Sequence, residues 1–204
     1  MLIWSILTQQ AWKQLRREGR LCASHRHGIK EFLGSYLWMA EQMEKRLKVQ
    51  RPSQDAMPIW AWRQWEGANR LKPDLRASGH LPSGVQGVRV ECRLDDRRVL
   101  LSDFDLWHYV LNYWYLPTSE RDGNAFEKKL AGVGLSFYKF NHSNPLPHAQ
   151  YQREIKRSWE RIFDVSWTDR RRAIANTPEK KSIQATLWEI CLEDVVETKE
   201  FTAR

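Results

Sequence analysis

Apolar and polar positions follow two periodicities along the chain, one typical of strands and one of helices. The order of these patterns predicts the order of the elements. Residues 2–7 form a short, partly β-branched apolar run that is typical of a strand. Residues 8–18 then follow a helical spacing that ends at Gly19, where a helix C-cap is expected. Residues 20–24 return to a strand pattern. The fold is therefore expected to open with a strand, a helix and a strand.

The strongest helical signal lies over residues 29–48. Apolar side chains recur there at spacings of three and four, at Ile29, Phe32, Leu33, Tyr36, Leu37, Ala40, Met43 and Leu47. This periodicity predicts the main core helix. A strand follows over residues 58–65, with Trp60 and Trp62 on one face because side chains alternate along an extended chain. Residues 69–84 have the composition of a loop.

The middle of the chain predicts a hairpin and a second helix. Residues 87–101 alternate between apolar and charged positions on either side of an Asp-Asp pair, which favours two strands joined by a turn. A helix follows that Ser102 or Asp103 can cap and that Pro117 ends.

The last third predicts a closing strand. Residues 118–147 favour a short helix with an irregular loop, and residues 148–164 a basic amphipathic helix. Residues 182–192 alternate as a strand, and residues 193–201 as a turn with a short strand. We therefore expect a single α+β domain over residues 1–204, with a small mixed or split antiparallel sheet, flanking helices, and the N- and C-terminal strands in the same sheet.

The net charge of the chain indicates one class of binding partner. The net charge of +8 creates a positive field that attracts polyanions such as nucleic acid, nucleotide phosphates or acidic proteins. The alternative is that the charge serves solubility alone. The apolar run at the start is too short for a membrane span, which predicts a soluble protein without a membrane partner.

The cysteines and histidines indicate the compartment and argue against a metal. Cys22, Cys92 and Cys191 are odd in number and widely separated, so they predict neither a disulfide framework nor a structural zinc, and they favour the reducing cytoplasm. The histidine spacings match no metal motif. P-loop, GxGxxG, HExxH and GxSxG motifs are missing, which argues against several common enzyme classes.

One candidate site combines indole rings with a cationic loop. Trp60 and Trp62 could stack a base or a nicotinamide, while Lys72 and Arg76 hold phosphate and Asp74 orients a ribose hydroxyl. The alternative is that the rings pack in the core. In that case Asp74 would form a local salt bridge with Arg76 or Lys72.

Asp103 is the candidate catalytic carboxylate, because it stands where a strand is expected to meet a helix. A carboxylate at such a junction can face a cleft and act as a general base. The alternative is helix capping, in which the carboxylate accepts the free N–H groups of the first turn.

A basic region near residues 156–172 is a candidate nucleic-acid surface. Trp159 and Trp167 interleave its cations, and such a surface could follow a phosphate backbone. The cations are Lys156, Arg157, Arg161, Arg170, Arg171 and Arg172. The alternative is an ordinary solvated face.

Several stretches resemble a known family. "WSILTQQAWKQLRREGRL", "YLWMAEQM", "PIWAWRQW", "KPDLR", "VLLSDFDLWHYVLN" and "QATLWEI" together resemble the uncharacterised bacterial and phage family called domain of unknown function 3841. The resemblance spans nearly the whole chain. It implies a free-standing cytoplasmic protein, and it does not imply an activity.

The opening strand, helix and strand are also similar to the start of ADP-ribosyltransferase-like domains, in which a split sheet holds NAD in a cleft. The first strand carries Trp4 and Thr8 without the His or Arg of that family's NAD-binding position. The closing strand offers Gln184 where the family's catalytic Glu is expected, and Glu189 lies further along. The resemblance implies that Gln184 contacts the substrate and that Asp103 or Glu189 stabilises the positive charge that develops when the glycosidic bond breaks.

Two functions follow from these features. The first is a nucleotide-binding cleft, with NAD as its cofactor, that supports transfer to a nucleic-acid or protein acceptor. The second is a non-catalytic modulator of the phage or host-defence type that binds nucleic acid or a protein through its basic, Trp-rich surface. A structural role in a larger assembly is a third alternative.

Overall fold

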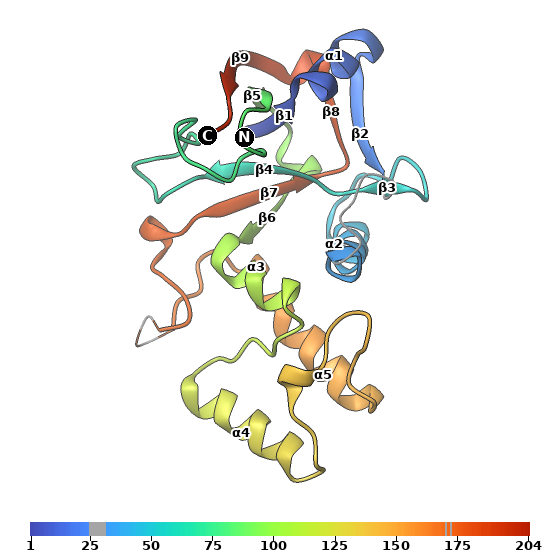
Figure 1. Cartoon of the computed structure of the whole chain (residues 1–204), viewed down its shortest axis with the longest axis vertical. Coiled ribbons are helices and arrows are strands. Elements are labelled where there is room, and N and C mark those ends of the chain that lie inside the picture. The colour runs from blue at the N-terminus through green and yellow to red at the C-terminus, as the bar shows by residue number, and fades with distance from the viewer. Residues whose placement is uncertain (25–31, 170, 172) are drawn as a thin grey trace.

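The computed structural model describes residues 1–24, 32–169, 171 and 173–204. It has an α+β fold in which strands occupy one half of the molecule and most helices the other (Figure 1). The helices are Gln9–Glu18 (α1), Leu33–Arg46 (α2), Phe104–Leu111 (α3), Glu120–Ala131 (α4) and Ala149–Trp159 (α5). Short 3-10 helices cover Asp96–Arg98, Phe137–Lys139, Glu160–Phe163, Pro178–Lys180 and Leu192–Asp194.

Among the described residues, six strands form one antiparallel sheet in the order β6-β7-β4-β1-β5-β9. They are Leu2–Thr8 (β1), Ile59–Gln64 (β4), Gln86–Arg93 (β5), Leu100–Asp103 (β6), Ile183–Leu187 (β7) and Val195–Thr202 (β9). β1 and β9 both pair with β5, so the terminal strands share one sheet, as the sequence predicts.

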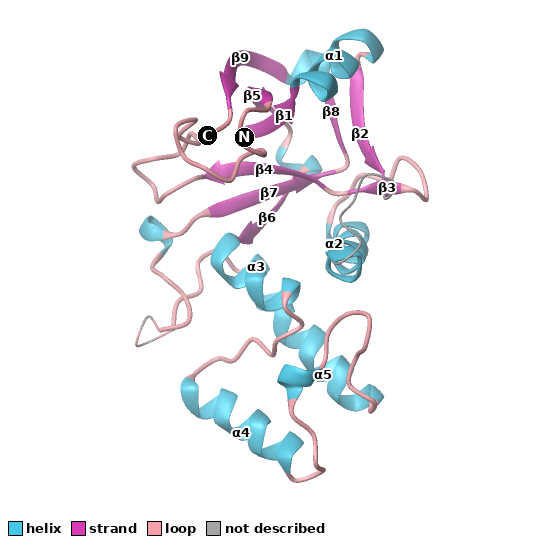
Figure 2. Cartoon of the chain, in the orientation of Figure 1, coloured by secondary structure: helices cyan, strands magenta, loops and turns pink. Residues whose placement is uncertain are grey.

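A smaller sheet of the order β3-β2-β8 lies beside the main sheet (Figure 2). Its strands are Arg20–Ser24 (β2), Ala56–Met57 (β3) and Glu189–Cys191 (β8). Only Trp188 separates β7 from β8, so a single segment of the chain contributes to both sheets. The expected split antiparallel arrangement is confirmed.

α1 covers one face of the main sheet and follows directly from its sequence. The Thr8 hydroxyl accepts the Ala11 N–H and caps the first turn, and Gly19 ends the helix with a φ of 74°. Leu15 is fully buried against Ile3 and Val90 of the sheet. Burying a side chain of this size contributes about 1.5–3 kcal/mol to stability.

The second core lies between the opposite face of the sheet and the helices α2, α3 and α5. Met39, Met43, Leu106, Ile155 and Trp159 are at most 1% exposed there. The helix predicted over residues 29–48 corresponds to α2, although Ile29 lies outside the described residues. In the part of the chain that the structure describes, no helix has the length and apolar character needed to cross a bilayer.

The predicted hairpin is wrong. β5 does not pair with β6, because β5 lies between β1 and β9 whereas β6 pairs with β7 at one edge of the sheet. The alternation of Val88 and Val90 correctly marks which side of β5 is buried. Such alternation does not specify the neighbouring strand, and the pairing with β1 over seven residues prevails.

Candidate functional site

A continuous row of side chains crosses one face of the main sheet. Strand registers place its members directly opposite one another, in the order Ser102, Gln184, Trp62, Trp4, Glu91 and Glu197. The predicted residues Trp62 and Gln184 therefore lie side by side, with Trp4 beyond them. Gln184 is 8% exposed, so it lies beneath the surface of the protein.

Trp60 and Trp62 share a face, as predicted, but their rings contact other rings of the protein. The Trp60 ring centroid lies 4.9 Å from that of Trp107 and 5.7 Å from that of Tyr36. The Trp62 centroid lies 4.5 Å from that of Trp65 and 5.0 Å from that of Phe104. Both tryptophans are half-buried, and these contacts are those of core packing.

Lys72 is held by carboxylates at the end of the same row. Its Nζ lies 2.7 Å from Glu91 Oε2 and 3.2 Å from Glu197 Oε2. The hydrogen bond to Glu91 raises the pKa of Lys72. Burial alone would raise the pKa of Glu91, but hydrogen bonds from Lys72 and the Trp4 indole outweigh burial and lower it. Lys72 thus neutralises acids of the sheet.

Asp74 and Arg76 form a local ion pair. Arg76 Nη2 lies 2.7 Å from Asp74 Oδ2, and Arg76 is 73% exposed. Hydrogen bonds from the side chain and backbone N–H of Arg76 hold the pKa of Asp74 well below its usual range. A shallow hollow of about 660 Å³ includes Lys72 and Asp74, but Trp60, Trp62 and Asp103 lie outside its lining.

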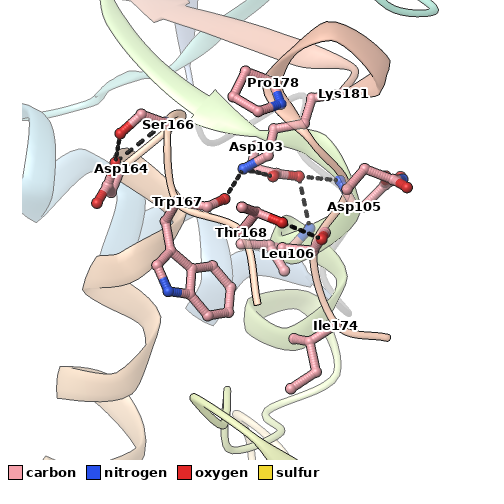
Figure 3. Close-up of polar contacts among 12 residues, drawn as sticks. Asp103, Asp105, Leu106, Asp164, Ser166, Trp167, Thr168, Ile174, Pro178 and Lys181 are labelled. Atoms are coloured by element: carbon pink, nitrogen blue, oxygen red, sulfur yellow. Dashed lines mark hydrogen bonds and ion pairs between the residues drawn. The ribbon is translucent and has the colours of Figure 1, made fainter. Parts of the chain in front are cut away.

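Asp103 caps α3 and forms a buried ion pair. Its Oδ1 accepts the backbone N–H groups of Asp105 and Leu106, and its Oδ2 lies 2.8 Å from Lys181 Nζ (Figure 3). The Asp103 and Lys181 side chains are 1% and 0% exposed. The carboxylate is therefore enclosed by protein atoms and does not face a cleft.

Glu189 lies in the smaller sheet, paired with Cys22 of β2. The Cys22 thiol donates to Glu189 Oε2 over 3.8 Å. Desolvation and then the Glu189 carboxylate raise the pKa of this thiol. Asp103 and Glu189, the two predicted catalytic carboxylates, thus have separate partners in separate sheets.

We expect Glu189→Gln to increase the reactivity of Cys22. The substitution removes a negative charge beside the thiol, so the pKa of Cys22 falls and more thiolate is present at mildly alkaline pH. Alkylation of Cys22 by iodoacetamide, followed by peptide mass spectrometry, should become a few-fold faster. Glu193→Gln, on the neighbouring 3-10 helix, is the matched control. An unchanged rate in Glu189→Gln would contradict this electrostatic coupling.

The described cations of the predicted nucleic-acid surface do not form one continuous patch. Lys156 and Arg157 line a shallow hollow between α2 and α5, together with acidic residues of both helices. Arg161 instead donates to the Leu116 carbonyl over 2.9 Å and lies over the Trp167 ring. Arg171 lines a larger hollow beside α4. Arg170 and Arg172 lie outside the described residues, and Trp159 is fully buried.

This larger hollow, the α4 groove, has a volume of about 1080 Å³. One wall is the helical face of α4 that carries Arg121, Asn124 and Lys128, spaced three and four residues apart. The other wall is formed by Trp167, Thr168, Asp169, Arg171, Ala173 and Ile174. Cations, an amide and an indole therefore meet across one groove.

Buried polar contacts hold the second wall in place. Lys181 Nζ, besides pairing with Asp103, donates to the Trp167 carbonyl over 2.6 Å (Figure 3). The indole of Trp167 points away from this ion pair (Figure 3). Asp103, predicted as catalytic, thus helps to position the segment that carries Trp167.

Asp169 organises the remainder of this wall. Its carboxylate accepts four backbone N–H groups at 2.9–3.2 Å, from Arg171, Ala173, Ile174 and Ala175. Burial alone would raise the pKa of Asp169, but these hydrogen bonds outweigh burial and lower it. The Asp169 carboxylate is therefore engaged in hydrogen bonds to the backbone.

The exposed charges of the α4 groove are mainly positive. Arg121, Lys128 and Arg171 line it, against Glu120 as the exposed acid. Glu120 is paired with Arg171 at 3.2 Å, whereas Arg121 and Lys128 form no ion pair among the described residues. Because the Arg171–Glu120 pair is exposed and such pairs contribute little, all three cations can contact an anionic ligand in this groove.

The sequence interpretation missed Arg121 and Lys128. Both lie on one face of α4, seven residues apart, and this spacing is visible in the sequence. The position of this helix face across the groove from Trp167 and Arg171 is a tertiary arrangement that no local sequence pattern indicates.

The fold and the groove define an α+β protein with a cationic, indole-containing groove. Residues 2–196 match the family model described as Domain of unknown function (DUF3841), and the chain belongs to that family. No curated protein and no solved structure matches the chain. The similarity to ADP-ribosyltransferase-like domains stays a prediction.

Proposed function

We propose that this protein binds nucleic acid through the α4 groove. The observation that carries the proposal is the convergence of Arg121, Lys128 and Arg171 on a groove that Trp167 also lines. Cations along a groove attract the phosphate backbone without reading its sequence. An indole in such a groove stacks on unpaired bases and contributes roughly 1–3 kcal/mol per base. Single strands are therefore the preferred ligand.

The arrangement of the groove supports this reading. The Arg161 guanidinium lies 5.1 Å from the centroid of the Trp167 ring, which adds a cation to the neighbourhood of any stacked base. Asn124, Thr118 and Ser119 add hydrogen-bonding groups along the same wall. The net charge of +8 favours association with a polyanion over long range.

The alternative of an NAD-dependent transferase receives no comparable support from the geometry. Its residues Trp60, Trp62, Lys72 and Arg76 each contact neighbouring side chains of the protein. Asp103 is paired with Lys181 in the interior. The α4 groove gathers free cations and an indole on one surface instead.

We expect the triple variant R121A/K128A/R171A to lose much of its affinity for single-stranded oligonucleotides. A plot of the logarithm of the association constant against the logarithm of the salt concentration has a negative slope. Removing three phosphate contacts should make this slope shallower by about 2, since each contact with a single strand contributes about 0.7. Fluorescence anisotropy titrations of a labelled oligonucleotide over a range of salt concentrations measure this slope.

The matched control is R17A/R76A/R97A. These three arginines are 69–74% exposed, and each is paired with a carboxylate one or two residues away. The net charge changes equally in both triple variants, so a loss caused by charge alone would appear in both. Equal losses, or an unchanged slope in R121A/K128A/R171A, would refute binding through the α4 groove. Preference for duplex over single strands would refute the stacking role of Trp167.

A further inference from the structure

The outer edge of β9 is a long strand edge without a partner in the described part of the chain. β9 is eight residues long and pairs with β5 on one side. Residues 196–200 are all exposed, and among the described residues no backbone hydrogen bond reaches the outer edge. The opposite edge strand, β6, has only four residues. Natural sheets usually shorten, cover or break such an edge.

The hydrogen bonding of β9 fixes which residues face outward. The Ala203 N–H donates to the Val85 carbonyl, and residues 202 to 197 continue the same antiparallel pairing with β5. Backbone groups alternate in direction along a strand. Residues 197, 199 and 201 therefore bond to β5, whereas Thr198, Glu200 and Thr202 direct their N–H and C=O groups outward. Val196 lies at a register shift between β5 and β9, where this alternation is interrupted.

We propose that two copies of this chain associate through antiparallel pairing of their β9 strands, with the two-fold axis at Thr198. A symmetric antiparallel pair can be centred on a residue whose backbone groups point outward or on a residue between two such residues. Centres at Glu197 or Lys199 would place like charges opposite one another, which disfavours them. An axis at Thr198 places residues 195–201 of the two copies opposite one another. The two six-stranded sheets would then join into one.

Charge complementarity selects this register. With the axis at Thr198, Glu197 lies opposite the partner's Lys199, and Lys199 lies opposite the partner's Glu197. A centre at Glu200 would place Lys199 opposite the partner's Phe201 and leave Glu197 without an opposite charge. Opposed side chains at positions that are not hydrogen-bonded approach most closely, so these charges lie where they interact best.

The charged groups at this edge are available for the pairing. Lys199 forms no ion pair among the described residues, and Lys72 contacts only Oε2 of Glu197. Val196 is 50% exposed, so the edge also offers apolar surface. Because this inference depends on β9 alone, its failure would leave the proposal for the α4 groove untouched.

Charge reversal tests the register. The wild-type protein should show concentration-dependent dimerisation in sedimentation velocity. E197K and K199E should each be monomeric, because each places like charges opposite one another. An equimolar mixture of E197K and K199E should form heterodimers, since every opposed pair is then complementary. A monomeric wild type at every concentration, or a mixture that stays monomeric, would overturn the proposal.

A second pair of variants tests the backbone contacts. T198P removes an N–H that points outward and is not used by the sheet, so it should block dimerisation without lowering the melting temperature appreciably. T198V keeps this N–H and should dimerise like the wild type. Dimerisation that persists in T198P would overturn pairing along the edge of β9.

Discussion

Replacing Lys181 with methionine is expected to lower the free energy of unfolding by about 3–5 kcal/mol. The substitution leaves the Asp103 carboxylate, which is 1% exposed, without its counter-charge. It also removes the hydrogen bond that Lys181 donates to the Trp167 carbonyl. Denaturant unfolding followed by tryptophan fluorescence measures the loss.

The pair should behave as a unit in a double-mutant cycle. Asp103→Asn keeps an oxygen that caps α3 but leaves the Lys181 ammonium buried and unpaired. The double variant D103N/K181M has no buried charge at this place and should be more stable than the sum of the single losses predicts. Lys129→Met breaks an exposed pair with Glu154 and should cost less than about 1 kcal/mol. Additive losses for Asp103 and Lys181 would contradict their coupling.

Local pattern predicts the elements of this fold well, because burial and capping leave a trace in neighbouring residues. The alternation at Trp60 and Trp62 correctly places both on one face. The capping alternative for Asp103 describes its contacts with the first turn of α3. Strand partners leave no such trace, which is why the predicted pairing of β5 with β6 is wrong.

The site is harder to predict than the fold because it depends on contacts between distant segments. Lys181 has no sequence feature that distinguishes it from the exposed Lys180. Its burial depends on Asp103, which lies at the end of β6, distant in the sequence. Likewise, Arg171 belongs to a basic run in the sequence, but it lines a groove only because Asp169 positions it opposite α4.

Replacing Asp169 with alanine separates the shape of the α4 groove from its charge. The substitution removes the acceptor of four backbone N–H groups, so residues 173–175 should lose their conformation and Arg171 its position. It also removes a negative charge beside the groove. If charge alone governed binding, D169A would bind nucleic acid more tightly than the wild type. We expect a loss about as large as that of R121A/K128A/R171A, although all three cations remain.

The pKa of Asp169 sets the conditions of this experiment. Because its folded pKa lies below the usual value of about 3.9, the stabilisation by ionised Asp169 is complete above that value. It is lost only as the pH falls through the lower folded pKa. The groove should therefore keep its shape throughout the neutral range, where anisotropy titrations are made. Faster hydrogen exchange at the Ala173 and Ala175 amides of D169A reports the loss of conformation.

The matched control is Asp164→Ala, which removes an acid close to the same wall but outside the lining of the groove. Asp164 contacts Ser166 and accepts none of the four N–H groups that Asp169 holds. D164A should therefore bind nucleic acid nearly as the wild type does, because Asp164 makes none of the hydrogen bonds that hold Arg171 and residues 173–175. Tighter binding by D169A, or an equal loss in both variants, would show that the conformation held by Asp169 does not create the binding surface.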